Sequence, residues 1–558
     1  MHRLAPLLLL LSCVAALGAQ SITTAQLENA ASDTSSWLSY GRDPFAQRFV
    51  RLTQITPANV TRLRPAWVFA TGGDNRGLQA TPLIYQGVLY LSADQSRVFA
   101  IDARTGRKKW SYDPKVGKDV ERVYCCGSNN RGVALWGDLV FVGTMDARLI
   151  ALHRDDGHVV WETRVIDWQG GYSITGAPLV VKDMVLTGVA GGEFGVRGFV
   201  KAFDARTGAE RWTTYTIPGP GEPGNETWPG DTWQHGGGST WITGSYDPDL
   251  HTVFWGIGNP GPFNAAVRKG DNLYTDSVLA LDPKTGKIKW HYQFSPNDPF
   301  DYDSVAEMIL ADMTVDGKST KVVMDANRNG FFYVLDRTNG RLLAANPYVN
   351  VNWASRIDLE TGRPVETDIA ARARAGEKVT VLPSILGGKN WSPMSFDPQT
   401  GFAYANTLNF GGHYKAIAVE YKAGDWYLGM DLGDLWEWPD GPRGYLKAIE
   451  PLTGKAKWEV PSDIPRFSGV LSTAGKVVFS GRLTGEFEAF DADTGAKLRS
   501  FQIGSGIEGQ PITREQDGVQ YVAVSTGIGG VYSIFSGDER LKNVPAGGSL
   551  WVFALHRT

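Results

Sequence analysis

The sequence predicts an all-β protein, an eight-bladed β-propeller in which four-stranded sheets are arranged radially. Three observations lead to this prediction. A short pattern occurs eight times, five times with tryptophan at its end, and successive copies are about 40 to 80 residues apart, which suits one four-stranded sheet per copy. The composition, with 66 Gly, 29 Pro and 19 Trp among 558 residues, is typical of many short strands joined by tight turns.

The recurring pattern is alanine, a large apolar residue, aspartate, two variable residues, Thr-Gly, three variable residues and tryptophan. Each copy predicts a strand, a turn and a second strand, because Asp and Thr side chains bond the turn backbone and Gly adopts positive φ. The tryptophan is expected to pack between neighbouring sheets. The four close copies and then the four degenerate copies are Ala100–Trp110, Ala202–Trp212, Ala280–Trp290, Ala448–Trp458, Ala151–Trp161, Val334–Ala344, Ser395–Ala405 and Ala489–Arg499.

The two ends of the chain carry similar apolar segments. These are Arg64–Ala70 (RPAWVFA) and Ser549–Ala554 (SLWVFA). A closed ring of sheets needs its first and last strands in one sheet, so we expect these segments to pair. Residues 20–558 are then expected to form a single propeller domain.

Residues 1–19 have the features of a secretory signal: a basic start, an apolar stretch from Leu7 to Leu17, and small residues ending at Ala19. We therefore expect a periplasmic protein. No later segment approaches the roughly 20 apolar residues of a membrane span. The net charge of -4, from 55 basic and 59 acidic residues without a long run of one sign, argues against a nucleic-acid partner.

Cys125 and Cys126 are the only cysteines that remain if the signal, which contains Cys13, is removed. Neighbouring Cα atoms lie about 3.8 Å apart, which is below the usual separation in a disulfide, so a bridge between them would be strained. Strain of this kind is typical of functional sites. The residues themselves leave two alternatives open, namely free thiols and an intermolecular bridge.

The tryptophan-bearing repeat resembles the tryptophan-docking motif of the pyrroloquinoline quinone (PQQ) dehydrogenases over nearly the whole chain. The segment CCGSNNRG resembles the family's cysteine segment, which implies a vicinal disulfide of Cys125 and Cys126 against one face of the quinone, and a cofactor bond from Arg131. Trp241, in GGGSTW, is similar to the tryptophan that stacks on the other face. A tryptophan that merely packs in the core is the alternative for Trp241.

The resemblance implies further cofactor contacts. Arg328 in NRNGFFYVLDR matches the basic residue that reaches the quinone oxygens, and a surface ion pair is its alternative. Gln79 occupies a position that is glutamate in some relatives, and Phe467 stands where the family often has tryptophan. The remaining expected contacts are Thr175, Gly191, Gly192 and Asn390.

Three segments resemble those that carry the metal ligands of the family: GGEFGVRG with Glu193, GNPGP with Asn259 and PNDPFDYD with Asp301. Oxygen ligands suit a hard cation. Asp303 follows two positions after Asp301, where lanthanide-dependent members carry aspartate and calcium-dependent members often have a small or neutral residue. The pattern is thus most similar to the lanthanide-dependent quinoprotein alcohol dehydrogenases, with calcium, and an ordinary loop aspartate at 303, as the alternative.

The resemblance implies oxidation of primary alcohols to aldehydes, with PQQ as hydride acceptor, a metal ion as Lewis acid and Asp301 as general base. The sequence has no Cys-x-x-Cys-His motif for haem attachment, so a separate electron acceptor such as a soluble cytochrome c is expected. Two other functions stay open: a non-catalytic propeller scaffold, which would have no use for the cysteine pair, and a PQQ dehydrogenase of sugars or polyols, which generally lacks that pair.

Overall fold

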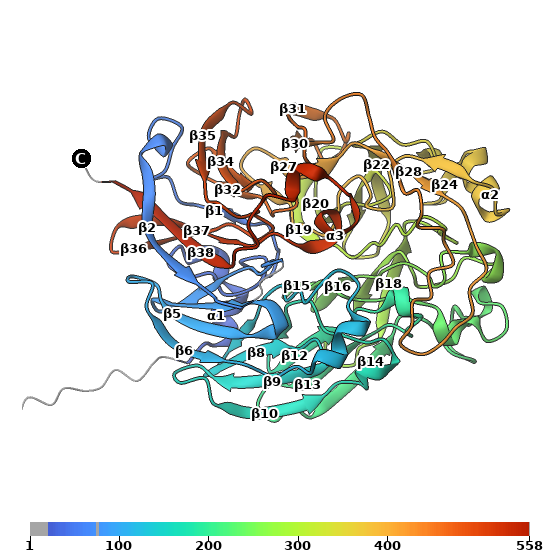
Figure 1. Cartoon of the computed structure of the whole chain (residues 1–558), viewed down its shortest axis with the longest axis horizontal. Coiled ribbons are helices and arrows are strands. Elements are labelled where there is room, and N and C mark those ends of the chain that lie inside the picture. Colours follow the sequence, from blue (N-terminus) through green and yellow to red (C-terminus); the bar gives the residue numbers. More distant parts are fainter. Residues whose placement is uncertain (1–20, 74–76, 557–558) are drawn as a thin grey trace, which may run out of the picture.

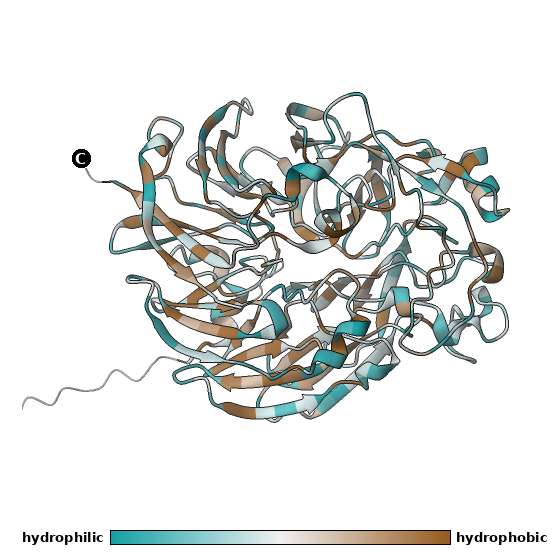
Figure 2. Ribbon diagram, in the orientation of Figure 1, coloured by the Kyte–Doolittle hydropathy of each residue, from teal (hydrophilic) through white to brown (hydrophobic). Residues whose placement is uncertain are grey.

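The computed structural model describes residues 21–73 and 77–556, so the expected signal at residues 1–19 lies outside the described residues. The protein is a mostly β propeller whose sheets are arranged around a common centre (Figure 1). Within the described ranges, eight sheets have four or five strands and two are smaller. The strands carry much of the apolar sequence, whereas many connecting turns are hydrophilic (Figure 2).

The first five large sheets follow one another along the chain, each as four antiparallel strands. The first comprises β3 (Leu83–Tyr85), β4 (Val88–Ser92), β5 (Val98–Asp102) and β6 (Lys108–Tyr112), and the second β7 (Ala134–Trp136), β8 (Leu139–Gly143), β9 (Arg148–His153) and β10 (Val159–Arg164). The third comprises β11 (Leu179–Val181), β12 (Met184–Gly188), β13 (Phe199–Asp204) and β14 (Glu210–Tyr215). The fourth and fifth are β15 (Ser245–Asp247), β16 (Thr252–Gly256), β17 (Ser277–Leu281) and β18 (Ile288–Gln293), then β19 (Ile309–Val315), β20 (Lys318–Ala326), β21 (Phe331–Asp336) and β22 (Leu342–Pro347).

Of the last three large sheets, the seventh and eighth combine strands from the two ends of the chain. The sixth is β26 (Ser395–Asp397), β27 (Phe402–Leu408), β30 (Gly444–Ile449) and β31 (Ala456–Ser462). The seventh is β1 (Phe49–Val50), β32 (Leu471–Thr473), β33 (Val477–Gly481), β34 (Glu486–Asp491) and β35 (Lys497–Gln502). The eighth is β36 (Ile512–Gln516), β37 (Val519–Thr526), β38 (Ser549–Leu555) and β2 (Leu63–Ala70). Because β2 pairs with β38, the predicted closure between the chain ends is confirmed.

Smaller elements lie between the large sheets. Two additional sheets are formed by β23 (Ala354–Ile357) with β24 (Pro364–Glu366), and by β25 (Val379–Val381), β28 (Gly411–Tyr414) and β29 (Trp436–Glu437). The α-helices are α1 (Thr24–Glu28), α2 (Asp368–Arg374) and α3 (Gly530–Phe535). No helix in the described ranges combines the length and the apolar character that a membrane crossing requires.

Each of the eight repeat copies forms two antiparallel strands joined by a turn, as predicted. The copies are not, however, distributed with one copy in each sheet. Ser395–Ala405 forms β26 and β27, in the same sheet as the copy Ala448–Trp458. The eighth sheet has no copy, because its outer strand β2 comes from the other end of the chain and no turn joins it to β38. The assignment of one copy to each sheet was therefore wrong. A further turn of the same type, at Asp358 between β23 and β24, was missed.

The bonding within the turns follows the predicted chemistry. Asp102 Oδ1 accepts hydrogen bonds from the backbone N–H groups of Arg104 and Thr105 (3.1 and 2.8 Å) and from Thr105 Oγ1 (2.8 Å). These bonds satisfy backbone donors that the strand ladder leaves free, which accounts for the Asp and Thr of the repeat.

The tryptophan of one repeat packs on the glycine of the next. Trp212 lies over Gly286, and its Nε1 donates to the Pro283 carbonyl (2.9 Å). Gly286 has a φ of +72°, and a Cβ there would lie 2.5 Å from the Trp212 ring, so only glycine fits. Trp67 of β2 makes the same contact with Gly106 and thereby docks the closing sheet onto the first. The tryptophans thus hold neighbouring sheets together, as expected.

Candidate active site

A cavity of about 570 Å³ opens among the loops at one end of the sheets. Its polar lining comes from segments before the first strand of a sheet, such as Trp241, and from links between second and third strands, such as Arg328. In a four-stranded antiparallel sheet these two kinds of connection leave at the same end. Residues far apart in the sequence therefore meet above the centre of the ring.

The cavity brings together nearly all the residues expected from the sequence. Gly192 and Asn259 do not line the cavity but lie directly behind its wall, where a Cβ on Gly192 would be 2.8 Å from Asn259 Oδ1. The expected residues that line it are Gln79, Cys125, Cys126, Arg131, Thr175, Gly191, Glu193, Trp241, Asp301, Asp303, Arg328 and Asn390.

Arg328 joins the two aspartates at the base of the cavity. Its Nη1 donates to Asp303 Oδ2 (2.8 Å) and to the Asp301 backbone carbonyl (2.9 Å), and it lies 3.6 Å from Asp301 Oδ2. The other oxygen of Asp303 accepts from the Asn259 backbone N–H (2.7 Å). Asp303 is thus held on both sides. Asp301, by contrast, has a φ of +61° and a buried Oδ1 with no partner among the described residues.

The three carboxylates are enclosed together with only one nearby guanidinium. Burial, followed by repulsion from Asp303, raises the pKa of Glu193 to about 7. Burial also raises the pKa values of Asp301 and Asp303, and Arg328 opposes both shifts. The cluster therefore carries uncompensated negative charge when ionised, which a cation would stabilise.

Arg131 lies between two indole rings. Its guanidinium carbon is 4.8 Å from the centre of the Trp241 ring and 4.5 Å from that of Trp391. Burial lowers the pKa of Arg131 to about 10, and its Nε and Nη1 have no hydrogen-bond partner in the described structure. A buried cation with free donors is suited to an anionic ligand. Trp391, which follows Asn390, was not anticipated.

The two cysteines lie on the cavity wall. Their sulfur atoms are 2.9 Å apart and are not bonded to each other in this structure. Asn129, which was also missed, donates to the Cys126 carbonyl (2.7 Å) and leaves its Oδ1 without a partner in the described part of the chain. The vicinal disulfide stays a prediction.

We expect the oxidised protein to contain the Cys125–Cys126 bridge and no free thiol in its mature part. Reduction should lower activity far more than it lowers the melting temperature, because a bridge between neighbours closes almost no loop of the unfolded chain. Intact-mass and thiol-labelling measurements, run beside an activity assay and a thermal melt, check both points. Two labelled thiols in oxidised, active protein would contradict the prediction.

Gln79 contacts a buried glutamate, Glu508, that no sequence motif marks. Its Nε2 donates to Glu508 Oε2 (2.9 Å), whereas its Oε1 has no partner in the described ranges. Glu508 precedes β36 and is only 2% exposed. Burial raises the pKa of Glu508 to about 8, although the hydrogen bond from Gln79 acts to lower it. The pair therefore places a carboxyl that is largely protonated at neutral pH beside the cavity.

This shift predicts how stability depends on pH. Between about pH 4.5 and 8 the folded protein keeps a proton on Glu508 that the unfolded chain has lost, so the free energy of unfolding falls as the pH rises. Glu508→Gln should remove that part of the fall, up to about 1.4 kcal/mol for each pH unit. Urea unfolding of both cofactor-free proteins at pH 5 and pH 8 measures it. Glu539→Gln, at an exposed site, is the control, and parallel pH profiles for wild type and Glu508→Gln would contradict the prediction.

The mouth of the cavity is apolar, a feature not expected from the sequence. Its side chains come from a long connection between β28 and β30 and from α3. No strand pattern marks these residues, and only the fold brings them together. They are Trp426, Leu428, Leu432, Leu435, Trp436, Val531 and Phe535.

Three of the expected positions have mainly structural contacts here. Thr175 accepts from the Arg131 backbone N–H (3.0 Å) and so holds that loop in place. The Asn390 side chain bonds the Leu386 carbonyl and the Trp391 N–H, both at 3.0 Å. Phe467 is buried against Tyr532 and is not among the residues that line the cavity.

The chain was compared with known protein families and structures. Residues 37–352 and 433–522 match the family model "PQQ: Glucose/ethanol/alcohol dehydrogenase, beta-propeller domain". A quinoprotein alcohol dehydrogenase PedH from Pseudomonas putida is 43% identical over 91% of this chain and 89% of its own length. A lanthanide-dependent methanol dehydrogenase from Methylacidiphilum fumariolicum is 40% identical over 94% and 90%. A solved europium-containing methanol dehydrogenase superposes with a TM-score of 0.90 at 38% identity, covering 95% of this chain and all of that one.

Proposed function

The chain belongs to the PQQ-dependent alcohol dehydrogenases, and on this premise we propose that it oxidises primary alcohols to aldehydes in the periplasm with PQQ and one metal ion. A separate acceptor, such as a soluble cytochrome c, would take the electrons. We infer that residues 20–558 form one domain in which the eight large sheets are the blades. The observation that carries the proposal is that Glu193, Asp301 and Asp303 share one cavity with the cysteine pair and Trp241.

The cavity is suited to a flat, polar, anionic cofactor. Buried polar atoms of the described residues lack partners at Gln79 Oε1, Asn129 Oδ1 and the Arg131 guanidinium, although such groups are normally bonded. A ligand with carbonyl and carboxylate oxygens would satisfy the Arg131 donors, and an N–H or O–H group of the ligand would satisfy the oxygens of Gln79 and Asn129. Trp241 offers an aromatic face and Cys125 and Cys126 offer polarisable sulfur. Residues expected to hold PQQ are therefore Gln79, Cys125, Cys126, Arg131, Thr175, Gly191, Gly192, Trp241, Arg328 and Asn390.

The donor set also suits a hard metal ion. Glu193, Asn259, Asp301 and Asp303 present oxygen atoms, and the unpaired oxygens of Asn259 and Asp301 among the described atoms are available to a cation. Three carboxylates supply more negative charge than a divalent ion needs. We therefore favour a lanthanide, with Ca²⁺ as the alternative, and the names of two relatives are consistent with this choice.

When bound, PQQ would supply the hydride acceptor for the alcohol carbon and the metal ion would supply Lewis acidity. Asp301 takes the hydroxyl proton, because Arg328 opposes the effect of burial on the pKa of Asp301 and so favours the ionised base. Arg328 supplies positive charge where negative charge develops. The apolar mouth receives the carbon chain of the alcohol and excludes water.

Reconstitution tests the proposal. The purified protein is loaded with PQQ and either Ca²⁺ or La³⁺, and primary alcohols, aldoses and polyols are assayed with an artificial electron acceptor. We expect turnover of primary alcohols, with apolar chains preferred over polyols because of the mouth. Cofactor and metal bound without turnover of any alcohol would indicate a non-catalytic scaffold, and a preference for aldoses would indicate a sugar dehydrogenase.

A further inference from the structure

The turn between β9 and β10 departs from every other turn of the repeat. Where three of the four close copies have aspartate it has His153, where all four have threonine it has Asp156, and His158 follows the glycine. In the copy at Asp102 the aspartate accepts three hydrogen bonds, all between 2.8 and 3.1 Å. In the turn between β9 and β10, His153 takes the place of this aspartate. Its Nδ1 accepts one backbone hydrogen bond, from the Asp155 N–H, at 3.4 Å. The substitutions thus weaken the turn's own bonding.

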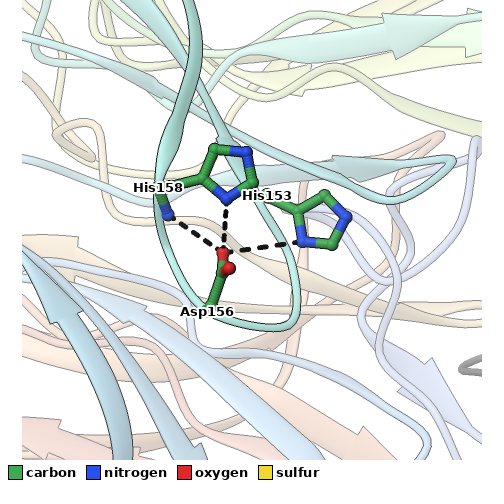
Figure 3. A group of neighbouring side chains, drawn as sticks. All are labelled: His153, Asp156 and His158. Carbon is green, nitrogen blue, oxygen red and sulfur yellow. Dashed lines mark hydrogen bonds and ion pairs between the residues drawn. The ribbon is translucent and has the colours of Figure 1, made fainter.

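The same substitutions gather three metal-binding side chains at one point. His158 Nδ1 lies 2.7 Å from Asp156 Oδ1, and His153 Nδ1 lies 3.6 Å from the same oxygen (Figure 3). The two imidazole rings are stacked, with centres 5.0 Å apart. One ligand atom from each residue lies within 4.8 Å of the other two. None of the three residues lines the central cavity.

We propose that His153, Asp156 and His158 form a second metal site, which binds a divalent transition-metal ion at the surface of the second sheet. Two imidazoles and one carboxylate are ligands for Zn²⁺, Ni²⁺ or Cu²⁺ rather than for a lanthanide or Ca²⁺, which prefer oxygen. The site therefore differs in chemistry from the all-oxygen cluster of the cavity.

The spacing is compatible with one ion. In the tetrahedral geometry of Zn²⁺, metal–ligand bonds of about 2.1 Å place donor atoms about 3.4 Å apart, so ligand atoms within 4.8 Å of one another need to close by up to about 1.4 Å. They have the freedom to do so, because the side chains of His153, Asp156 and His158 are 33%, 64% and 59% exposed. Water completes the coordination. The ion would also cross-link the two ends of the turn and replace bonds that Asp102 makes in its copy and His153 does not make here.

The repeat itself supplies a variant that removes the ligands without disturbing the fold. His153→Asp combined with Asp156→Thr restores the residues found in the close copies, and His158→Ala removes one exposed ligand. His556→Ala, at another exposed histidine, is the matched control. The experiment uses untagged holoenzyme with its cavity metal bound, titrated with ZnCl₂ by calorimetry and with CuCl₂ for electron paramagnetic resonance.

We expect wild type and His556→Ala to bind one more Zn²⁺ than the double variant, and His158→Ala to bind it at least about tenfold more weakly. The Cu²⁺ spectrum of wild type should show nitrogen coupling from two imidazoles. Zn²⁺ should raise the melting temperature of wild type and leave that of the double variant unchanged, and alcohol oxidation should be equal in all four proteins. Equal Zn²⁺ stoichiometry in wild type and double variant, or a Cu²⁺ spectrum unaltered by His158→Ala, would overturn the proposal.

Discussion

Asp301→Ala is expected to lower turnover by about 10²- to 10⁴-fold, the range associated with loss of a general base. The substitution removes both a proposed metal ligand and the proposed base. It also removes one of the carboxylates that face Arg328. Steady-state assays with PQQ and metal present, accompanied by metal analysis and the cofactor absorption spectrum, separate lost chemistry from lost binding. Near-normal turnover with both groups bound would show that Asp301 is not the base.

Asp301→Asn is the matched variant. It keeps an oxygen that can bind the metal but cannot accept the hydroxyl proton. Asparagine also tolerates the left-handed backbone at this position, with a φ of +61°, better than alanine does. We expect Asp301→Asn to bind metal nearly as wild type does and still to turn over slowly. Glu193→Ala should differ from Asp301→Asn: it should lose metal binding first, and its activity should recover at high metal concentration.

Asp303 is expected to decide which metal the enzyme uses. Wild type should be most active with a light lanthanide, and Asp303→Ala should lose this response, with lanthanide affinity reduced by about 10- to 100-fold. The physical reason is charge: Asp303 is the third carboxylate of the cluster, and a trivalent ion gains more from it than Ca²⁺ does. Terbium luminescence and metal analysis measure affinity independently of turnover.

Asp303→Asn tests the competing explanation that Asp303 only holds Arg328 and Asn259 in place. The amide keeps the size of the side chain and one oxygen, so it can accept from Arg328 Nη1 or from the Asn259 N–H but not from both, and it lacks the charge. If charge selects the metal, Asp303→Asn behaves like Asp303→Ala. Full activity with calcium alone, no effect of lanthanide and indifference to Asp303→Ala would identify the metal as calcium.

Much of the fold could be predicted from the repeat, because its information is local. Asp102 and Thr105 satisfy the donors of their own turn, so each copy forms a strand, a turn and a strand wherever it occurs. The closing pair of β2 and β38 could be found because both segments carry the same apolar pattern. The copy Ser395–Ala405 was misassigned because a local pattern does not show which position its strands take in a sheet.

The cavity residues were found where they lie in long segments resembling those of the family, such as those of Cys125 and Asp301. Glu508 was missed because no motif surrounds it, whereas Asn129 lies within CCGSNNRG and Trp391 beside Asn390, where only the neighbouring residues were selected. Glu508 is notable only because folding buries it against Gln79, 429 residues away in sequence. The apolar mouth was missed for the same reason, because its side chains come from two separate loops.

The sequence by itself determined the class of fold, the turns and the kinds of side chain available for cofactor and metal. What these side chains can do chemically depends on their separation and burial, which exist only in the folded chain. The tertiary structure alone decided that Arg328 lies between Asp301 and Asp303, that Arg131 lies between two indoles, and which carboxyls are removed from water. Electrostatic free energies depend on separation and burial rather than on distance along the chain. The charge balance of the site was therefore set by folding, whereas the expectation of a trivalent ion came from Asp303 in the sequence.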